Sequence, residues 1–550
     1  MAKIFYPDFF NDVFGPIMQP GSSGGFAGPA RIGNVARHLI NEEPQKVVFS
    51  LQHEDIGRFK SLGNFMTDRG YLGGVQGFAT DDKRLFDAHR LAQEKKLSYE
   101  FRLDDGNFGY FRAVKINVYG ESSQGELIGA SVGGGMIRIY EAYGYELNWQ
   151  ADTYGTLVID VDSGDGNVSG NSKLRFDELI SKLAGKYGDH IVEHRIVSNA
   201  DGKAALFIET DTDISEEDIL EGSAGLVVNL PAVLPVVTTK AKKKQLFSTV
   251  EEWRQVASDR GISFLQAAIE YEKDASGWSE EEIWAFFTKI RDIFDRQIHS
   301  LEELDYDAED TPTLPIYGKL WKKYLDGGKV ISDSLTRHIL THAYATNAKI
   351  PGFKIVPGPM GTGGGYLYSA LDAVREDRGY SRERELEALV IAAALGALAY
   401  THTNASGDRG CIGESGVCNA MAAGAIAYMV TPDEPLVDVG VAVERAASMA
   451  LQANMGLVCD PIPGGLEFPC ITRTLRAAVT APMYAEMAII GIDPLIPYHE
   501  CLQAMERHYR LTPPERLCGS DCGTCTTPAA QKCKQFLSDL MADNLKFEAV

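Results

Sequence analysis

The stretch from residue 404 to residue 473 constrains this chain most, because it places cysteines in turns between apolar helical segments. Cys411 follows two glycines in the run Ser406-Gly-Asp-Arg-Gly-Cys411, and Cys459 and Cys470 each lie within two residues of a proline. Glycine and proline interrupt regular structure, so we expect these thiols on stiff loops at helix ends rather than within a packed helix face. Thiolates held on such loops can converge on a metal.

All nine cysteines of the chain follow residue 410, and the preceding three quarters of the sequence contain none. Disulfide frameworks are typical of small secreted domains, and a chain of 550 residues has no need of one. Cys501 falls inside the helical run 499–509, where a buried free thiol is the common arrangement. We therefore interpret Cys501 as a core residue and the cysteines in turns as candidate metal ligands.

A second group of cysteines, Cys518, Cys522 and Cys525, has the spacing C-x3-C-x2-C near the C-terminus, and Cys533 follows it. This spacing is the signature of radical S-adenosylmethionine enzymes, but no repeated strand-helix pattern follows it to build the barrel of that class. Three interpretations stay open, namely an additional thiolate for the main metal site, a second metal site, and a redox-sensitive tail.

Three segments of the cysteine-bearing stretch carry a family pattern. Residues 406–416, 456–461 and 468–473 read Ser-Gly-Asp-Arg-Gly-Cys-Ile-Gly-Glu-Ser-Gly, Gly-Leu-Val-Cys-Asp-Pro and Phe-Pro-Cys-Ile-Thr-Arg. Together they resemble the catalytic part of the iron–sulfur-dependent L-serine dehydratases, and the resemblance extends to residues 12–18 and 131–141 and covers most of the chain. The resemblance implies a [4Fe–4S] cluster with one iron open to substrate, and its ligands would be Cys411, Cys459 and Cys470.

The N-terminal region contains a loop rich in glycine and serine, Pro20-Gly-Ser-Ser-Gly-Gly-Phe26, followed by a helical pattern over residues 30–40. Backbone N–H groups at such a loop and helix start favour an anionic group such as a substrate carboxylate. The dehydratase family carries its substrate-anchoring Pro-Ser-Ser-Ser-His-Thr loop at this place. Ser22 and Ser23 match two of those hydroxyls, whereas glycines and Phe26 replace the histidine and the threonine.

A second family segment, Gly-His-Gly-Thr-Asp, corresponds to residues 63–68, which read Gly-Asn-Phe-Met-Thr-Asp. The resemblance implies substrate contacts from Asn64 and Thr67, and the family histidine is missing here as well. Two imidazoles that bind carboxylate or move protons are therefore absent together, which leaves the identity of the substrate open.

A glycine-rich loop is expected over residues 352–366, between helical patterns. Its backbone N–H groups can cradle a carboxylate or the edge of the cluster. No Walker lysine follows these glycines, which argues against phosphate binding. For the general base, His402 is the histidine nearest in sequence to the ligand loop, although a lone histidine at the end of an apolar helix is commonly structural. The further candidate substrate contacts are Thr362, Gly363, Gly364, Ser406 and Arg409.

We expect a multidomain α+β chain of four parts. Residues 1–150 form a beta-like α/β portion, in which the alternating pattern of residues 127–149 around three glycines predicts a hairpin. Residues 151–235 have a strand, helix, strand, strand order that indicates a ferredoxin-like βαββαβ module, and related dehydratases carry an ACT-like module here. Residues 236–330 read as a linker followed by helices, one of which should begin with a capping box at Ser279. Residues 331–550 read as the mostly helical, alpha-like catalytic domain.

Composition favours a soluble cytoplasmic enzyme that acts on a small molecule. The formal net charge is −23 and the sequence pI is about 5.0, and no basic block stands out beyond residues 240–244, which argues against nucleic-acid binding. The sequence shows neither a signal-peptide pattern nor a run of 18 apolar residues, so we expect no membrane segment. We also expect a homo-oligomer.

The resemblance implies elimination of water from a 3-hydroxy acid. Hydroxide is a poor leaving group, and an iron without a cysteine ligand is a Lewis acid that takes up the substrate hydroxyl. L-Serine, which would give pyruvate and ammonia, is the preferred substrate on family frequency. Two alternatives stay open. One is dehydration of 2-(hydroxymethyl)glutarate or another hydroxy acid without an amino group, and the other is a non-catalytic iron–sulfur sensor of oxygen or iron.

Overall fold

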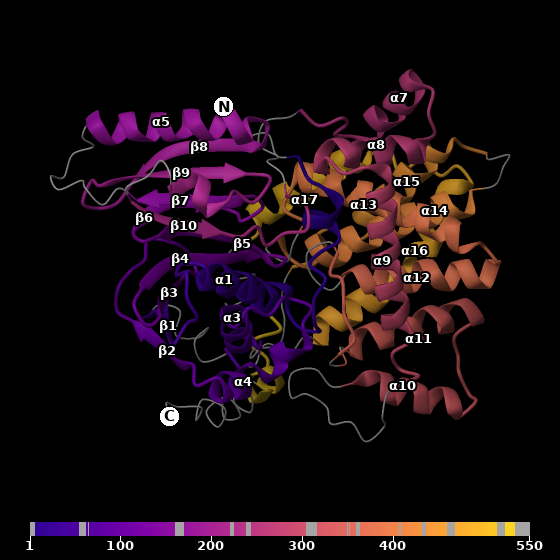
Figure 1. The fold of residues 1–550 in the computed structure, drawn as a ribbon. Helices are drawn as coiled ribbons and strands as arrows, with labels where there is room; N and C mark the ends of the chain where they lie inside the picture. Colours follow the sequence, from indigo (N-terminus) through magenta and orange to yellow (C-terminus); the bar gives the residue numbers. More distant parts are fainter. Residues whose placement is uncertain are drawn as a thin grey trace. The chain divides into compact units, whose positions relative to one another are not determined.

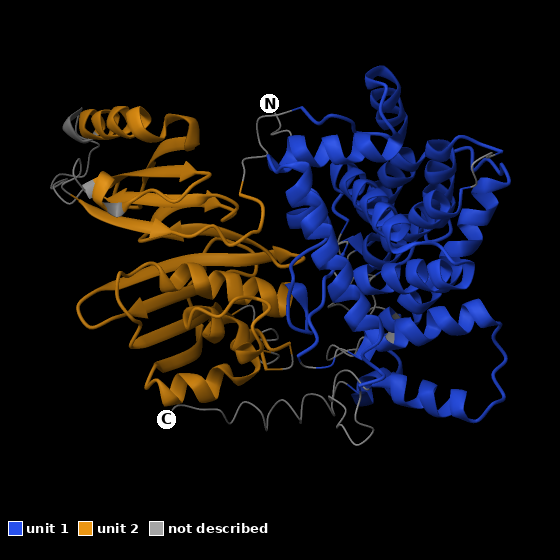
Figure 2. Cartoon of the chain, turned by 45° about the vertical axis from the view of Figure 1, so that its right-hand side comes forward, with its two compact units in different colours: residues 1–23, 240–543 blue, residues 24–239, 544–550 orange. Residues whose placement is uncertain are grey.

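The computed structural model of the chain divides into two compact units (Figure 2). We call residues 24–239 together with 544–550 the sheet unit, and residues 1–23 together with 240–543 the helical unit. The residues that the structure describes are 6–53, 62–63, 65–159, 170–220, 225–237, 244–303, 316–348, 350, 352–358, 363–405, 409–431, 436–458, 468–513 and 523–533.

The larger sheet of the sheet unit consists of β1 (Lys46–Gln52), β2 (Ser98–Asp104), β3 (Val114–Tyr119), β4 (Gln124–Gly133), β5 (Met136–Ala142) and β6 (Tyr145–Trp149). Their order across the sheet is β2-β1-β3-β4-β5-β6 (Figure 1). β1 and β2 run parallel, and the other neighbours are antiparallel. Residues 133–135, at the turn between β4 and β5, have φ angles of 112°, 60° and 79°, which glycine adopts without steric cost. The hairpin predicted over residues 127–149 is confirmed, and β6 extends it by a third strand.

Short helices pack on this sheet, among them α1 (Gly28–Arg37), α3 (Thr67–Val75) and α4 (Ala88–Glu94). Ile32 of α1 is buried in the same core as Phe49 of β1. α1 and α3 approach each other through glycine, because a Cβ on Gly33 would lie 2.3 Å from the carbonyl oxygen of Tyr71. The absence of a Cβ on Gly33 therefore allows the two helices to pack this closely.

The smaller sheet of the sheet unit consists of β7 (Tyr154–Ile159), β8 (Ile191–Ser198), β9 (Ala204–Thr210) and β10 (Leu226–Leu230). Its order is β10-β7-β9-β8, and all pairs are antiparallel. α5 (Gly170–Tyr187) connects β7 to β8, and α6 (Glu216–Leu220) connects β9 to β10. The predicted βαββαβ order of elements is therefore present, and buried residues of α5, such as Phe176 and Leu183, pack against the sheet.

The helical unit begins with α7 (Val250–Arg260), α8 (Phe264–Ser276) and α9 (Glu280–Ile298), and it continues with α10 (Tyr317–Asp326), α11 (Ser334–Ala348), α12 (Gly363–Arg378), α13 (Arg382–His402), α14 (Val417–Val430), α15 (Val439–Gln452), α16 (Phe468–Ile489) and α17 (Tyr498–Leu511). The capping box predicted at Ser279 is confirmed, since its hydroxyl accepts from the N–H of Glu282 while the Glu282 side chain accepts from the N–H of Ser279.

Two apolar helices, α13 and α14, occupy the interior of the helical unit, and nearly every residue of α14 is buried. Among the described residues, α13 is the one helix long and apolar enough by length and composition to cross a membrane, and 78% of its apolar 18-residue stretch is buried inside the structure. A helix that is apolar all round is typical of a protein core as well as of a membrane span.

The first residues of the chain pack into the helical unit. They form the π-helix η1 (Phe9–Val13), in which the N–H of Phe9 donates to the carboxylate of Glu272 at 2.8 Å. Met18 then pairs with Ile355 in an isolated antiparallel bridge. These contacts attach residues 9–18 to the helical unit. The expected domain boundaries stay predictions.

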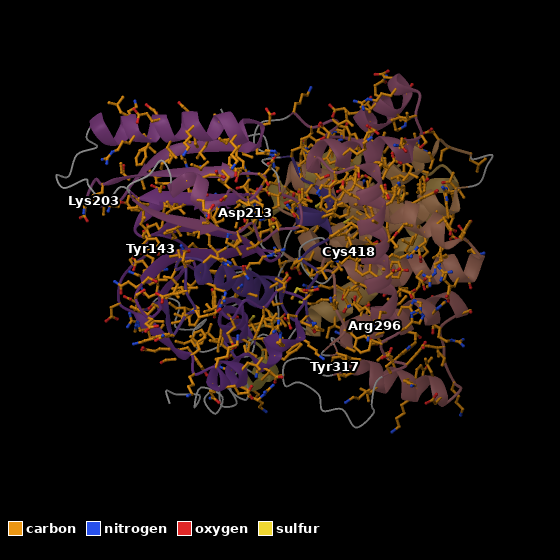
Figure 3. The ribbon with its side chains drawn as sticks, in the orientation of Figure 1. Tyr143, Lys203, Asp213, Arg296, Tyr317 and Cys418 are labelled. Atoms are coloured by element: carbon orange, nitrogen blue, oxygen red, sulfur yellow. The ribbon has the colours of Figure 1, made fainter. Side chains whose placement is uncertain are left out.

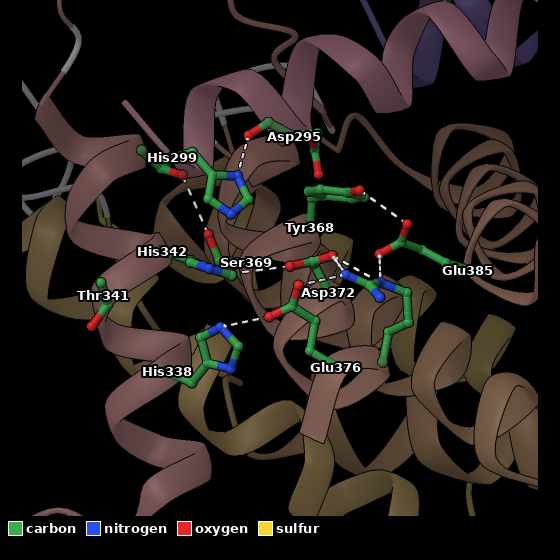
Figure 4. Close-up of polar contacts among 12 residues, drawn as sticks. Asp295, His299, His338, Thr341, His342, Tyr368, Ser369, Asp372, Glu376 and Glu385 are labelled. Carbon is green, nitrogen blue, oxygen red and sulfur yellow. Dashed lines mark hydrogen bonds and ion pairs between the residues drawn. The ribbon is translucent and has the colours of Figure 1, made fainter. Parts of the chain in front are cut away.

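A buried network of charged side chains joins α12 to α13 (Figure 4). Asp372 and Glu385 are fully buried. Arg375 bridges them, and its Nε lies 2.9 Å from Asp372 Oδ1 and 3.1 Å from Glu385 Oε1. Arg382 donates to Asp372 at 3.2 Å and to Glu385 at 3.1 Å, and the hydroxyl of Tyr368 donates to Glu385 at 3.0 Å. Two guanidinium groups thus surround two buried carboxyl groups.

Removal of one carboxylate should destabilise the helical unit. In Glu385→Ala, Arg375 and Arg382 lose a buried partner, so we expect the free energy of unfolding to fall by about 3 to 5 kcal/mol. Denaturant unfolding of the full chain measures this change. Arg378→Ala is the matched control, because the Arg378 side chain is 57% exposed and pairs with Asp377 at the surface. A loss in Glu385→Ala no larger than in the control would contradict the role of the network.

Three groups of this region have shifted pKa values. Burial and the neighbouring Asp372 raise the pKa of Glu385 to about 7. Burial opposes the ionisation of Asp372, but hydrogen bonds from Glu385 and Arg375 outweigh it and lower its pKa. Burial, with the neighbouring His338, lowers the pKa of His342 to about 3. The Glu385 contribution to stability is therefore lost as the pH rises to about 7, and the His342 contribution is lost as the pH falls below about 6.5.

The opposite pH dependences of the Glu385 and His342 contributions to stability can be measured separately by substituting each residue. The difference in unfolding free energy between the wild type and Glu385→Gln should decrease as the pH rises from about 5 to about 7, because the folded wild type holds a proton that the unfolded chain releases. The difference in unfolding free energy between the wild type and His342→Gln should increase over the same range. The reason is that the unfolded chain binds a proton on this histidine, whereas the buried imidazole of the folded protein stays neutral. Urea unfolding at a series of pH values measures both. A difference for Glu385→Gln that stays constant over this range would show that Glu385 is ionised in the fold.

Candidate functional site

Cys411 lies at the start of a short π-helix, η8 (Ile412–Gly416), which leads directly into α14. Gly410, before it, has a φ of 90°, a conformation that glycine adopts freely. Cys411 is buried and is not part of a disulfide. π-helical turns are frequent at functional sites. The expectation of a thiol on a turn at a helix end is confirmed for this residue.

Three segments that carry the candidate ligands meet within the helical unit. The N–H of Ile412 donates to the carbonyl of Leu457 at 3.2 Å. The guanidinium of Arg473 donates to the carbonyl of Val458 at 2.8 Å, and the hydroxyl of Ser415 donates to the carbonyl of Arg473 at 3.1 Å. The η8 turn, the segment ending at residue 458 and the first turns of α16 are therefore linked to one another directly.

The other two candidate ligands follow from these segments. Cys470 lies in the first turn of α16, is partly exposed and is not part of a disulfide. Cys459 follows Val458 directly and lies outside the described residues. Within the described part of the chain, no group of three histidine, cysteine, aspartate or glutamate side chains could hold a metal ion. The three-cysteine ligand set stays a prediction, and the two described thiols fit it because neither is in a disulfide and both lie on linked segments.

Two further cysteines belong to the packed core. Cys418, in the first turn of α14, is buried within the helical unit (Figure 3), and its thiol donates to the carbonyl of Gly363 at 3.1 Å. Burial raises the pKa of Cys418 to about 12, so this thiol stays protonated at neutral pH and ties α14 to the start of α12. Cys501 of α17 is buried, and its sulfur lies 3.3 Å from the hydroxyl oxygen of Ser448. The core role predicted for Cys501 is confirmed.

The glycine-rich segment 352–366 is only partly a loop. α12 already begins at Gly363, so the expectation of a loop is wrong for the last four residues. A Cβ on Gly364 would lie 2.3 Å from the carbonyl oxygen of Val356, so the close packing at this position requires glycine. The substrate contacts expected from Gly363 and Gly364 stay predictions, and Thr362 lies outside the described residues.

The N-terminal candidate anchors lie at helix starts. Ser23 is buried and begins the π-helix η2 (Ser23–Ala27), which runs directly into α1, and Ser22 precedes it. Thr67 is buried and is the first residue of α3. Asn64 lies outside the described residues. Their contacts with a substrate stay predictions.

The family-like segments of the sheet unit are close in space. A Cβ on Gly70 of α3 would lie 2.5 Å from the carbonyl oxygen of Phe26, so the start of α3 packs beside the start of α1. A Cβ on Gly28 would lie 2.3 Å from the hydroxyl oxygen of Ser131, the first residue of the Ser-Val-Gly-Gly-Gly motif. That buried hydroxyl has no hydrogen-bond partner among the described residues. Segments spread over a hundred residues of sequence thus surround the start of α1.

A histidine that sequence reasoning missed lies beside one of these segments. Nε2 of His89, on α4, lies 2.7 Å from the carboxylate of Asp68, and its Nδ1 lies 2.9 Å from the hydroxyl of Tyr99. Burial opposes the ionisation of Asp68, but the hydrogen bond with His89 outweighs it and lowers the pKa of Asp68. Asp68 belongs to a family segment, and that is the sequence feature that could have pointed to this position. No local pattern in the sequence pairs Asp68 with His89.

The candidate base His402 lies at the end of α13. Its Nε2 lies 2.7 Å from the carbonyl oxygen of Ser248, to which the ring donates, and burial lowers the pKa of the imidazole. This hydrogen bond gives His402 a structural role. It also leaves Nδ1 as the ring nitrogen that can accept a proton. Its role as a base stays a prediction. Ser406 lies outside the described residues.

Arg409 lies two residues before Cys411 and is held by α17. Its Nε donates to Glu506 Oε2 at 2.6 Å, and the guanidinium carbon lies 4.3 Å from the centre of the Tyr509 ring. Burial opposes the ionisation of Glu506, but hydrogen bonds from Thr403 and Arg409 outweigh it and lower its pKa. No local pattern in the sequence connects α17 with the ligand loop.

The tail cysteines are described only in part. Cys525 is buried and forms a disulfide, and Cys533 is free and partly exposed. Cys518 and Cys522 lie outside the described residues. The three interpretations of the C-x3-C-x2-C group therefore stay predictions, and in this structure the sulfur of Cys525 is oxidised rather than a thiolate.

Comparison with known proteins identifies the family. Residues 259–518 match the family model described as serine dehydratase alpha chain. A protein of Bacillus subtilis (strain 168) named "Probable L-serine dehydratase, beta chain" is 31% identical over 226 residues, which are 41% of this chain and 94% of the relative. The chain belongs to the L-serine dehydratase family. The resemblance inferred from the cysteine-bearing segments is thus confirmed.

This dehydratase-family chain combines portions that are separate in some relatives. The L-serine dehydratase alpha chain of Peptoniphilus asaccharolyticus is 27% identical over 266 residues, 47% of this chain and 87% of the relative. The L-serine dehydratase of Streptomyces coelicolor is 26% identical over 358 residues, 61% of this chain and 74% of the relative. The family member described here thus fuses a beta-like and an alpha-like portion, and its relatives support a lyase of the dehydratase type.

Cys418→Ala should reduce stability and leave iron binding intact. Loss of the buried thiol and of its hydrogen bond should lower the free energy of unfolding by about 1 to 2 kcal/mol. Cys411→Ala, at a candidate ligand, should instead lose iron, measured as iron content and visible absorption after anaerobic reconstitution. Cys501→Ala is the matched control for a buried thiol. Equal loss of iron in Cys418→Ala and Cys411→Ala would contradict the structural role of Cys418.

Proposed function

We propose that this family member is an iron–sulfur-dependent L-serine dehydratase, which converts L-serine into pyruvate and ammonia. The main support is that the turn with Cys411, the first turns of α16 with Cys470 and the segment that ends one residue before Cys459 are hydrogen-bonded to one another. Further support comes from the names of the relatives, which specify L-serine. Loops that carry thiols and are tied to one another suit a shared ligand better than separate core positions.

Cys411, Cys459 and Cys470 would hold a [4Fe–4S] cluster. The donor set fits, because thiolates are the ligands of such clusters and the two described thiols are not in disulfides. When bound, the cluster supplies a Lewis acid that activates the substrate hydroxyl as a leaving group. Three protein ligands would leave one iron of the cluster without a protein ligand for this task.

The protein side chains would bind the substrate and take its proton. Arg409 supplies a positive charge beside the ligand turn for the substrate carboxylate. The hydroxyls of Ser22, Ser23 and Thr67 and the N–H groups at the start of α12 are the further candidate anchors. His402 is retained as the candidate base, because its lowered pKa keeps the imidazole neutral and Nδ1 carries a lone pair.

The remaining properties are part of the same proposal. The strand order β10-β7-β9-β8 with two connecting helices supports an ACT-like reading of the βαββαβ module, which would bind a regulatory ligand or form an interface. We also propose a cytoplasmic homo-oligomer with a small hydroxy acid as its substrate. The names of the relatives favour L-serine over 2-(hydroxymethyl)glutarate and over a role as an iron–sulfur sensor.

Activity after anaerobic reconstitution tests the proposal. The wild type should bind iron and form pyruvate and ammonia from L-serine in equal amounts, and Cys411→Ser should lose both the iron and the activity because its alcohol is a poor ligand for the cluster. Cys501→Ser, away from the ligand segments, should keep both. Iron-free wild-type protein would overturn the proposal, and a complete cluster with no product from L-serine would favour another substrate or a sensor.

A further inference from the structure

Arg409 is fixed from two directions by α17. Glu506 accepts from its Nε at 2.6 Å, and Tyr509 covers one face of the guanidinium at 4.3 Å. Glu506 is itself held, since it accepts from the hydroxyl of Thr403 at 2.8 Å and from Nε of Arg510 at 3.0 Å. An arginine restrained on its Nε edge and on its face has little freedom to turn its terminal nitrogens.

The charges around Arg409 do not cancel. Arg409 and Arg510 share the single carboxylate of Glu506, so the three groups together carry one positive charge. The Arg510 side chain is 74% exposed and is hydrated, whereas that of Arg409 is 21% exposed. The excess positive charge that water screens least therefore lies on Arg409, two residues from Cys411.

The terminal nitrogens of Arg409 are the part of the side chain that this arrangement leaves available. The structure records a hydrogen bond from its Nε, and it records none from either terminal nitrogen to a residue in the described ranges. Two parallel N–H groups of a guanidinium match the two oxygens of a carboxylate. A sulfate or phosphate would fit the same charge, but the proposed reaction supplies a carboxylate.

We propose that Arg409 binds the substrate carboxylate through its terminal nitrogens, and that Glu506 and Tyr509 are positioning residues that aim it. This inference rests on the proposed function, and it defines the substrate class as 2-amino- or 2-substituted 3-hydroxy carboxylates rather than their neutral amides. Glu506 and Tyr509 act through Arg409 and do not touch the substrate. α17 thereby becomes part of the active site, although it contributes no ligand to the cluster.

Kinetics with a matched pair of probes tests the inference. Arg409→Gln should raise the KM for L-serine at least about tenfold, leave the iron content unchanged, and remove most of the preference for L-serine over L-serinamide, which has a neutral carboxamide. Glu506→Ala should raise the KM by about three- to tenfold with kcat within about twofold, and Glu506→Gln, which keeps an oxygen acceptor for Nε, should have the smaller effect. Arg507→Ala, at an exposed position of the same helix, is the control.

The outcomes separate this inference from the proposed function. A KM within about twofold of the wild type in Arg409→Gln, with iron intact, would overturn the role of Arg409. If the wild type does not turn over L-serine, the proposed function fails, and calorimetric titration with L-serine and L-serinamide then decides the inference. Preference for L-serine in the wild type that is lost in Arg409→Gln would support it, and equal binding of both probes to the wild type would overturn it.

Discussion

The candidate centre depends on one backbone hydrogen bond, from the N–H of Ile412 to the carbonyl of Leu457. It joins two turns that are distant in sequence, and Gly410 and Gly456, with φ angles of 90° and 84°, allow the chain to bend at both. The buried helices on either side hold these turns on rigid elements. Arg473 then connects α16 to the same segment through Val458. Loops fixed in this way hold side chains in place before any ligand binds.

The rest of the helical unit keeps this centre rigid. Cys418 ties α14 to the start of α12, and the carboxylate and guanidinium groups of Asp372, Glu385, Arg375 and Arg382 tie α12 to α13. The network costs desolvation free energy and is not by itself evidence of high stability. Its geometry is nonetheless specific, because each buried carboxylate accepts from both arginines. The helix that follows the glycine-rich segment is thereby held at both ends.

Features that depend on interactions between neighbouring residues were predicted from local sequence patterns. The capping box at Ser279, the hairpin of residues 127–149 and the strand and helix order from β7 to β9 follow from caps, glycine turns and periodicity. The pairs Arg409–Glu506 and Asp68–His89 could not be predicted, because their partners lie on elements that only the fold brings together. The contacts of Phe9 with Glu272 and of Met18 with Ile355 could not be predicted for the same reason.

The charge of the protein explains why a fixed arginine matters. The chain carries a net charge of −23, so an approaching carboxylate is repelled on average, and screening at physiological ionic strength reduces this repulsion beyond about 8 Å. Binding must therefore come from a local positive charge that is poorly hydrated and correctly aimed. Lysine would supply the charge on a flexible stem, whereas Arg409 has its Nε edge occupied by Glu506 and one face covered by Tyr509. The same contacts that remove its freedom leave a planar fork of the geometry that a carboxylate requires.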